Sequence, residues 1–363
     1  MRISILLPNL NGGGAERVAL DLADAFAELG HSVEFVLLRA EGVFLEHAKE
    51  RHKVVNLNVS RIRSAIVPLI SYIRKNRPDG LIAAMWPLTF IAPVAMKLSF
   101  HRSPVLTVEH SILSNQYANW GHLHHFALRL SMALGFRLAN ARAGVSAGVV
   151  EDVAKLAAYP VSGVQTLYNP IPTPSTASLE ALRNAESYWI RPKGHRIIIV
   201  GNLKTVKNHA LLLSAFAELN DPSACLLILG QGYLETDLRL RADQLHISAQ
   251  VVFAGFHADP TAFYQTADLL VLSSDYEGFG NVIVEALGCG LPIVSTDCPS
   301  GPSEILENGH YGRLTPVGDA NALARAMQEA LSSPFDSEVL KRRAADFSPE
   351  RAARAYLKAL RLA

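Results

Sequence analysis

The sequence predicts an α/β protein built from two doubly wound parallel-sheet domains. Short apolar runs of strand length alternate with amphipathic helical stretches along most of the 363 residues. This alternation starts at residue 2 and restarts near residue 195, after a proline-rich segment. A chain of this length also exceeds one typical domain and suits two. Two such sheets predict a ligand cleft between the domains, near the carboxyl ends of the strands.

The first half opens with a strand at 2–7, a loop at 8–14 and a helix at 15–29. Apolar side chains of the helical stretch recur on one face, and Gly30 ends it. Later strands of this half are expected at 31–38, 80–84, 105–108 and 143–145. The apolar run 81–100 contains two prolines and a lysine, so we interpret it as a buried strand followed by a helix rather than a membrane span.

The second half repeats this order, with a strand at 196–200, a loop at 201–208 and a helix at 209–219. Its later strands are expected at 225–229, 251–254, 269–272 and 293–295. Three prolines in the segment 169–174 mark the boundary, because proline breaks regular elements and stiffens a connection. We therefore expect one domain over 1–170, a second over 171–345, and a C-terminal helical segment, 346–363, that packs back onto the first.

Composition places the chain among globular proteins of a reducing compartment. Hydrophobic residues make up 49% and charged residues 18%, which excludes a disordered chain. Cys225, Cys289 and Cys298 show neither a disulfide framework nor metal-ligand spacing. The apolar run near the N-terminus is too short for a secretory signal. These features predict a cytoplasmic location.

Charge is distributed unevenly between the halves. Residues 1–170 carry 17 Lys and Arg against 12 Asp and Glu, and the stretch 60–142 carries ten basic residues against only Asp79 and Glu109. This basic stretch predicts peripheral contact with an anionic membrane, at the inner face of the plasma membrane, or with a phosphorylated acceptor. An ordinary solvated surface is the alternative.

The strongest candidate site is the segment 277–285, Glu-Gly-Phe-Gly-Asn-Val-Ile-Val-Glu, which follows an expected strand and leads into a helix. Gly278 and Gly280 allow close approach of the backbone to a ligand, and the start of a helix favours phosphate or sugar oxygens. Glu277 and Glu285 can accept hydrogen bonds from two sets of hydroxyl groups. Taken alone, a surface turn before an exposed glutamate explains the same pattern.

These two glutamates, with seven residues between them, resemble the E-x7-E motif of glycosyltransferase family 4. Further motifs similar to those of this family follow one another along nearly the whole chain, at 11–17, 145–146, 168–171, 200–207, 229–232 and 296–305. The resemblance implies the GT-B fold, in which two Rossmann-like domains face each other across a cleft. It also implies an enzyme of the hexosyltransferase type that retains the anomeric configuration, similar to bacterial enzymes of polysaccharide and lipid-linked oligosaccharide synthesis.

The resemblance assigns roles to matching positions. Glu277 would contact the hydroxyls of the donor sugar, Glu285 those of the ribose, and Lys207 the diphosphate whose charge builds as the sugar leaves. The implied catalytic residues are His110, Lys207 and Glu277. The implied donor-binding residues are Gly13, Gly14, Asn202, Lys204, Gly230, Gly278, Phe279, Gly280, Asn281, Val282 and Glu285.

Asn202 departs from the family pattern, which has an arginine at this position of the phosphate loop. Lys204 would supply the positive charge instead, but its ammonium group lacks the planar guanidinium geometry with which arginine binds two phosphate oxygens at once. His110 follows an expected strand, and the resemblance implies that it lines the cleft, whereas a lone histidine is more often structural. The glycines of 12–14 lack the third glycine of a dinucleotide fingerprint, which would fall at Arg17, so a nicotinamide site is disfavoured.

No Asp-x-Asp occurs in the chain, so we expect cationic side chains and helix dipoles in place of a divalent metal, and no cofactor. His122, His124 and His125 form a cluster that we interpret as a polar helix face. The expected donor is a UDP-sugar, with GDP-mannose second, and the expected acceptor is a glycan or lipid-linked molecule of cell-surface polysaccharide, lipopolysaccharide or glycolipid synthesis. No nucleic-acid partner is expected. The alternatives are a nucleotide-sugar epimerase and a non-catalytic nucleotide-sugar-binding protein.

Overall fold

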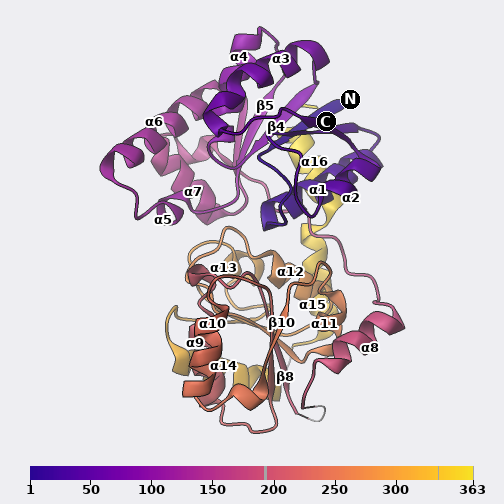
Figure 1. Ribbon diagram of the computed structural model, residues 1–363, viewed down its shortest axis with the longest axis vertical. Coiled ribbons are helices and arrows are strands. Elements are labelled where there is room, and N and C mark those ends of the chain that lie inside the picture. The colour runs from indigo at the N-terminus through magenta and orange to yellow at the C-terminus, as the bar shows by residue number, and fades with distance from the viewer. Residues whose placement is uncertain (192–193, 334, 363) are drawn as a thin grey trace. The chain divides into compact units, whose positions relative to one another are not determined.

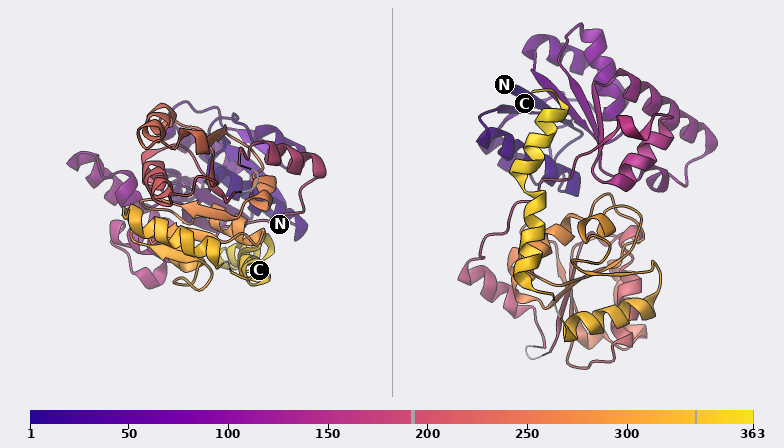
Figure 2. Two further views of the ribbon diagram at one scale, coloured as in Figure 1. Left: turned by 90° about the horizontal axis from the view of Figure 1, so that it is seen from below. Right: turned by 180° about the vertical axis from the view of Figure 1, so that it is seen from behind.

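The computed structural model describes residues 1–191, 194–333 and 335–362, and it divides into two compact units (Figure 1). The N-terminal unit comprises Met1–Ile171 and Phe347–Ala363, and the C-terminal unit comprises Pro172–Asp346. In each unit a parallel sheet is covered by helices on both faces (Figures 1 and 2). Both faces of such a sheet are buried, which explains the continuous apolar runs of its central strands.

Seven parallel strands form the sheet of the N-terminal unit, in the spatial order β3-β2-β1-β4-β5-β6-β7. Their bounds are β1 (Arg2–Leu7), β2 (Ser32–Leu37), β3 (Lys53–Asn56), β4 (Gly80–Ala84), β5 (Val105–Glu109), β6 (Ala141–Gly144) and β7 (Gln165–Thr166). The helices of this unit are α1 (Gly14–Glu28), α2 (Leu45–Arg51), α3 (Ile66–Asn76), α4 (Leu88–Ser99), α5 (Leu113–Gln116), α6 (His122–Leu138), α7 (Ala147–Leu156) and α16 (Pro349–Ala359). The last of them, α16, packs against α1.

Six parallel strands form the sheet of the C-terminal unit, in the order β10-β9-β8-β11-β12-β13. Their bounds are β8 (Arg196–Val200), β9 (Cys225–Leu229), β10 (Val251–Gly255), β11 (Leu269–Leu272), β12 (Ile293–Thr296) and β13 (Arg313–Thr315). The helices are α8 (Leu179–Ser187), α9 (His209–Glu218), α10 (Glu235–Gln244), α11 (Thr261–Thr266), α12 (Asn281–Gly288), α13 (Pro302–Ile305), α14 (Ala320–Ser332) and α15 (Ser337–Ala344). One face of the sheet packs on α9 and α14 through a continuous apolar core.

Both sheets reverse their strand order at one point, between β1 and β4 in the first and between β8 and β11 in the second. At such a reversal the loops after the two neighbouring strands turn to opposite faces and leave a crevice at the carboxyl edge of the sheet. In the C-terminal unit, these two loops are 201–208 and 273–280. The fold therefore brings the predicted phosphate loop beside the predicted E-x7-E segment.

The run 81–100 forms β4 and α4, as the sequence predicts, and no helix in the described part of the chain is both long and apolar enough to span a bilayer. Three strands that the sequence does not predict, β3, β7 and β13, lie at sheet edges. These three edge strands are partly buried or exposed and lack the apolar run of a central strand, whereas the fourth edge strand, β10, has such a run and is predicted.

Candidate functional site

An ion pair lies at the switch point of the C-terminal unit, where the strand order reverses between β8 and β11. Lys207 lies in the loop after β8, Glu277 lies in the loop after β11, and Lys207 Nζ is 2.6 Å from Glu277 Oε1. Both side chains are largely buried, with 22% and 10% of their surfaces exposed. At this degree of burial the two charges attract more strongly than in water. The structure therefore brings together two of the three predicted catalytic residues.

Neighbouring hydroxyl groups fix this pair in place. Ser274 Oγ donates to Glu277 Oε1 at 2.6 Å, and Ser273 Oγ donates to the carbonyl of Lys207 at 2.9 Å. Thr296, at the end of β12, donates to the carbonyl of Ser274. Glu277 Oε2, by contrast, has no hydrogen-bond partner within the residues that the structure describes. This oxygen is available to accept a hydrogen bond from a ligand hydroxyl.

The loop between Glu277 and α12 is shaped by glycines. Gly280 caps α12 in a left-handed conformation, with φ 101° and ψ 53°, so α12 begins at Asn281 with its amino terminus at the carboxyl edge of the sheet. A Cβ on Gly301 would lie 1.8 Å from the carbonyl oxygen of Phe279, so only glycine permits this close packing. The side chain of Phe279 is buried and anchors the loop. The arrangement directs the positive end of the α12 dipole into the crevice.

A third loop, which follows β9, packs beside these two. Gly230, after β9, has φ 144°, and a Cβ there would lie 2.0 Å from the carbonyl oxygen of Gly201. This contact holds the start of the phosphate loop against the loop after β9. Asn202 and Lys204 are exposed on the same loop, while Leu203 between them is buried. Lys204 is therefore open to solvent, in contrast to the largely buried Lys207.

Glu285 lies one turn inside α12, next to Val282 and Asn281, which are partly buried. Its Oε2 accepts a hydrogen bond of 2.8 Å from the hydroxyl of Tyr264, a buried residue of α11. Burial and the charge of Glu285 raise the pKa of Tyr264 well above its usual value, so the phenol stays protonated and acts as the donor. Tyr264 thus orients Glu285, a contact that the sequence pattern does not reveal.

In the N-terminal unit the predicted residues also lie at the carboxyl edge. Gly13 caps α1 after β1, and Gly14 is the first residue of that helix. His110 directly follows β5, and its buried Nδ1 has no hydrogen-bond partner in the described part of the chain. Burial lowers the pKa of His110 to about 4, so its imidazole is neutral near pH 7. A neutral ring can donate from one nitrogen and accept at the other.

Glu109 is the last residue of β5 and is fully buried. Its carboxylate accepts hydrogen bonds from the hydroxyl of Thr89 at 2.5 Å and from the backbone N–H of Trp86 at 3.0 Å. Burial raises its pKa to about 7. A carboxyl group in this state populates both protonation forms near neutrality, so it can hold or release a proton beside His110.

Two sequence families match the chain in succession. Residues 12–174 match the model described as Glycosyltransferase Family 4, and residues 183–347 match the one described as Glycosyl transferases group 1. The two matches together leave only the ends and a short connection uncovered. The chain belongs to glycosyltransferase family 4. The resemblance predicted from the E-x7-E segment and its companion motifs is thereby confirmed.

Proteins related to this family 4 member are named as glycosyltransferases. An N-acetylgalactosamine-N,N'-diacetylbacillosaminyl-diphospho-undecaprenol 4-alpha-N-acetylgalactosaminyltransferase of Campylobacter jejuni is 31% identical over 51% of the chain and 49% of its own length. The lipopolysaccharide core biosynthesis glycosyltransferase LpsE of Rhizobium meliloti is 34% identical over 38% of the chain and 39% of its own. The match thus spans about half or less of these curated relatives. Another Campylobacter jejuni protein, a GalNAc-alpha-(1->4)-GalNAc-alpha-(1->3)-diNAcBac-PP-undecaprenol alpha-1,4-N-acetyl-D-galactosaminyltransferase, is 25% identical over 96% of the chain and 94% of its own.

Solved structures share the fold of this family 4 member. Anabaena Alr3699/HepE in complex with UDP-glucose superimposes with a TM-score of 0.83, at 22% identity over 99% of both chains. WaaG, a glycosyltransferase involved in lipopolysaccharide biosynthesis, gives 0.72 at 17% identity, over 97% of this chain and 99% of its own. At such identities the likeness concerns the fold alone, and it confirms the predicted GT-B architecture of two Rossmann-like units.

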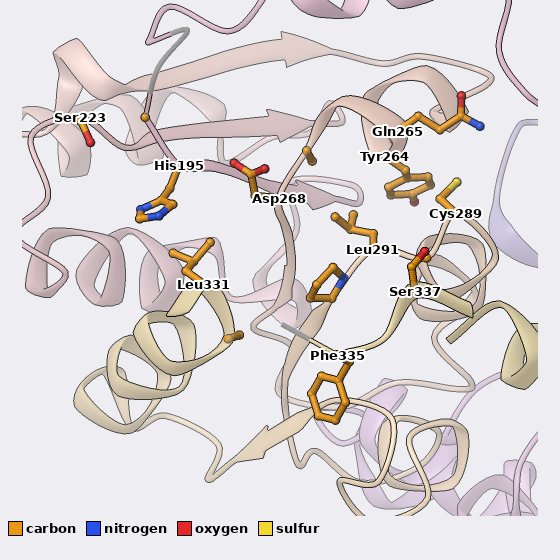
Figure 3. A pocket seen from close by; sticks show the side chains of 15 residues that line it. His195, Ser223, Tyr264, Gln265, Asp268, Cys289, Leu291, Leu331, Phe335 and Ser337 are labelled. Atoms are coloured by element: carbon orange, nitrogen blue, oxygen red, sulfur yellow. The ribbon is translucent and has the colours of Figure 1, made fainter. Parts of the chain in front are cut away.

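The C-terminal unit of the family 4 member also contains a cavity of about 590 Å³, and Tyr264, the partner of Glu285, is among its lining residues (Figure 3). Its lining includes His195, Asp268 and Pro292, which directly precede β8, β11 and β12, so it lies at the amino edge of the sheet. None of the predicted site residues lines it. Ligands of doubly wound sheets bind at the opposite, carboxyl edge, and we therefore locate the candidate site at the switch point.

Among the residues that the structure describes, no three His, Cys, Asp or Glu side chains gather in a metal-ligand arrangement. His122, His124 and His125 lie in the first turn of α6. Trp120 contacts the ring of His124 edge-on at 5.4 Å, so this ring belongs to an aromatic cluster of the N-terminal unit.

Proposed function

We propose that this chain is a retaining glycosyltransferase that moves a sugar from a nucleotide diphosphate sugar to a glycan or lipid-linked acceptor. The observation that carries the proposal is the Lys207–Glu277 pair at the switch point, beside the amino terminus of α12. Together they offer a cation, an open carboxylate oxygen and a positive dipole end within one crevice. A diphosphate bound to a hydroxyl-rich sugar matches these three groups.

The donor would lie with its diphosphate on Lys207 and on the amino terminus of α12. Lys207 has three N–H donors, so it can retain Glu277 while it contacts a phosphate oxygen. Glu277 Oε2 would accept from a sugar hydroxyl, and Glu285 from the ribose. A UDP-sugar is the favoured donor, and solved proteins of this fold that hold UDP or UDP-glucose support that choice.

The chemical step would keep the anomeric configuration through displacement on one face of the sugar. The bond between the anomeric carbon and the leaving phosphate oxygen breaks as the acceptor oxygen attacks from the same side, and that phosphate oxygen takes the acceptor proton. Lys207 and the α12 dipole stabilise the negative charge that develops on the phosphate. We propose that these fixed groups replace a divalent cation and that no cofactor takes part. We also propose that neutral His110, in the N-terminal unit, hydrogen-bonds a sugar hydroxyl.

A panel of nucleotide sugars tests this function. We expect a UDP-sugar to raise the melting temperature in the presence of EDTA, because a ligand at a hundred times its Kd stabilises the folded state by about 2.7 kcal/mol. Failure of every UDP-, GDP- and ADP-sugar to bind or be turned over would contradict the proposal. Binding lost on EDTA treatment would contradict metal independence, and conversion of the donor to a stereoisomer without acceptor would identify an epimerase.

We also propose that the enzyme contacts an anionic membrane through α6. One face of this helix is core, and the opposite face exposes a stripe formed by Leu123 (83% exposed), Phe126 (66%), Leu130 (49%) and Leu134 (43%). Their spacing of three to four residues aligns them along the helix. Between Glu109 and Glu151 the sequence has no acidic residue, and α6 itself carries two arginines. An apolar stripe in a basic setting suits the surface of a bilayer with anionic lipids.

Charged substitutions in this stripe should release the protein from vesicles. The affinity for vesicles of anionic phospholipid is measured by sedimentation. We expect the double variant Leu123→Glu/Phe126→Glu to bind at least about tenfold more weakly than wild type, because it loses two apolar side chains that insert into the bilayer. Leu179→Glu, at an equally exposed leucine of α8, is the matched control and should bind normally. Equal binding of the double variant, or no binding of wild type, would refute membrane contact by α6.

A further inference from the structure

Four aromatic rings form a cluster at the carboxyl edge of the N-terminal sheet. Trp86 follows β4, Tyr117 follows α5, and Trp120 and His124 lie at the start of α6. The ring centroids of Tyr117 and Trp120 are 4.2 Å apart, and those of Trp86 lie 5.3 Å from Tyr117 and 5.7 Å from Trp120. We call these residues, with His124, the aromatic platform. Segments distant in sequence thus converge on one surface.

The platform is rigid on one side and open on the other. The indole N–H of Trp86 donates to Ser131 of α6 at 2.9 Å, which fixes that ring against the helix. Tyr117 is half-buried, and 38% of Trp120 is exposed. Large aromatic side chains that are clustered and partly exposed to solvent are more typical of binding surfaces than of surface without a ligand or partner.

The platform also adjoins the polar groups of the carboxyl edge. The backbone N–H of Trp86 donates to Glu109 at 3.0 Å, and the charge of Glu109 helps burial to raise the pKa of Tyr117. His110 follows Glu109 directly. An apolar surface bordered by an imidazole and a phenol suits an amphipathic ring with C–H groups on its face and hydroxyls on its rim.

We propose that the aromatic platform is the subsite for a sugar ring of the acceptor. The C–H face of a pyranose would stack on Trp120 and Tyr117, and one of its hydroxyls would hydrogen-bond His110, whose Nδ1 has no partner in the described part of the chain. The inference rests on the proposed glycosyl transfer and deepens it, since it places a saccharide, rather than a bare lipid, on the acceptor side. A purely lipid ligand would leave His110 Nδ1 without a hydrogen bond.

Saturation-transfer NMR with simple glycosides tests the subsite without knowledge of the natural acceptor. The probes are the methyl glycosides of glucose, galactose, N-acetylglucosamine and N-acetylgalactosamine, each with wild type and with the Trp120→Ala variant. We expect at least one glycoside to receive saturation from wild type, and its affinity to fall about five- to tenfold in the variant, as the loss of one aromatic contact implies. Trp120→Leu, which keeps apolar volume, should show the same loss and so separates stacking from folding.

The matched control is Phe100→Ala, at an exposed aromatic of the same unit that precedes β5 at the opposite edge of the sheet. It should bind the glycoside as wild type does. UDP-sugar binding, measured on all variants by melting temperature, should be unchanged. If UDP-sugars bind but no glycoside contacts wild type, or Trp120→Ala binds as well as wild type, the platform proposal fails while the proposed transfer stands. If no nucleotide sugar binds either, the proposed function fails with it.

Discussion

Replacement of Lys207 by alanine is expected to lower kcat about a thousandfold, the upper range for loss of one group that stabilises developing negative charge. Lys207 Nζ is the cation of the ion pair in the switch-point crevice, and its side chain is largely buried. The KM for acceptor should change little, because the lost interaction strengthens only as the phosphate leaves. Steady-state kinetics with the donor identified by the binding panel measure both constants.

Two comparison variants sharpen this result. Lys207→Arg keeps the charge but not the compact ammonium geometry, so an intermediate loss of about tenfold is expected. Lys341→Ala removes an exposed lysine of the same unit that pairs with Glu338 one turn away, and it should retain full activity. A kcat of Lys207→Ala within threefold of wild type would remove Lys207 from the mechanism.

Glu277→Gln is expected to reduce kcat/KM for the donor about a hundredfold. The amide can still accept the bond from Ser274, yet it loses the charge that pairs with Lys207 and one of two acceptor oxygens. Glu277→Ala should cost about a thousandfold and destabilise the unit by about 1–3 kcal/mol, since it leaves the largely buried Lys207 without its partner. Thermal melting alongside kinetics separates the two effects.

The double variant Lys207→Ala/Glu277→Ala tests whether the two residues act as a unit. It should be no more than about tenfold slower than Lys207→Ala alone, because loss of either partner already disables the pair. Glu235→Gln, on the exposed surface of α10, is the matched carboxylate control. Fully additive losses would show that Lys207 and Glu277 contribute independently, contrary to the contact between them.

Local pattern alone determined the central framework of both sheets. The strands 2–7, 80–84, 196–200, 225–229 and 269–272 match β1, β4, β8, β9 and β11 residue for residue. These strands are buried on both faces, so burial leaves a dense apolar run in the sequence. The switch-point residues of the C-terminal unit were also identified from the sequence, but through the resemblance to family 4, because the local pattern alone fits a surface turn equally well. The edge strands β3, β7 and β13 left no comparable signal.

Tertiary structure decided which of these residues meet. The contact of Lys207 with Glu277 spans 70 residues and exists because β8 and β11 are neighbours in the sheet although β9 and β10 lie between them in the chain. The Tyr264–Glu285 bond and the aromatic platform arise in the same way, from side chains on separate elements. A residue type at a position records whether a side chain must be buried or charged. The side chain that it contacts is determined by the strand order. Strand order depends on the packing of the whole sheet, so no local stretch of sequence predicts it.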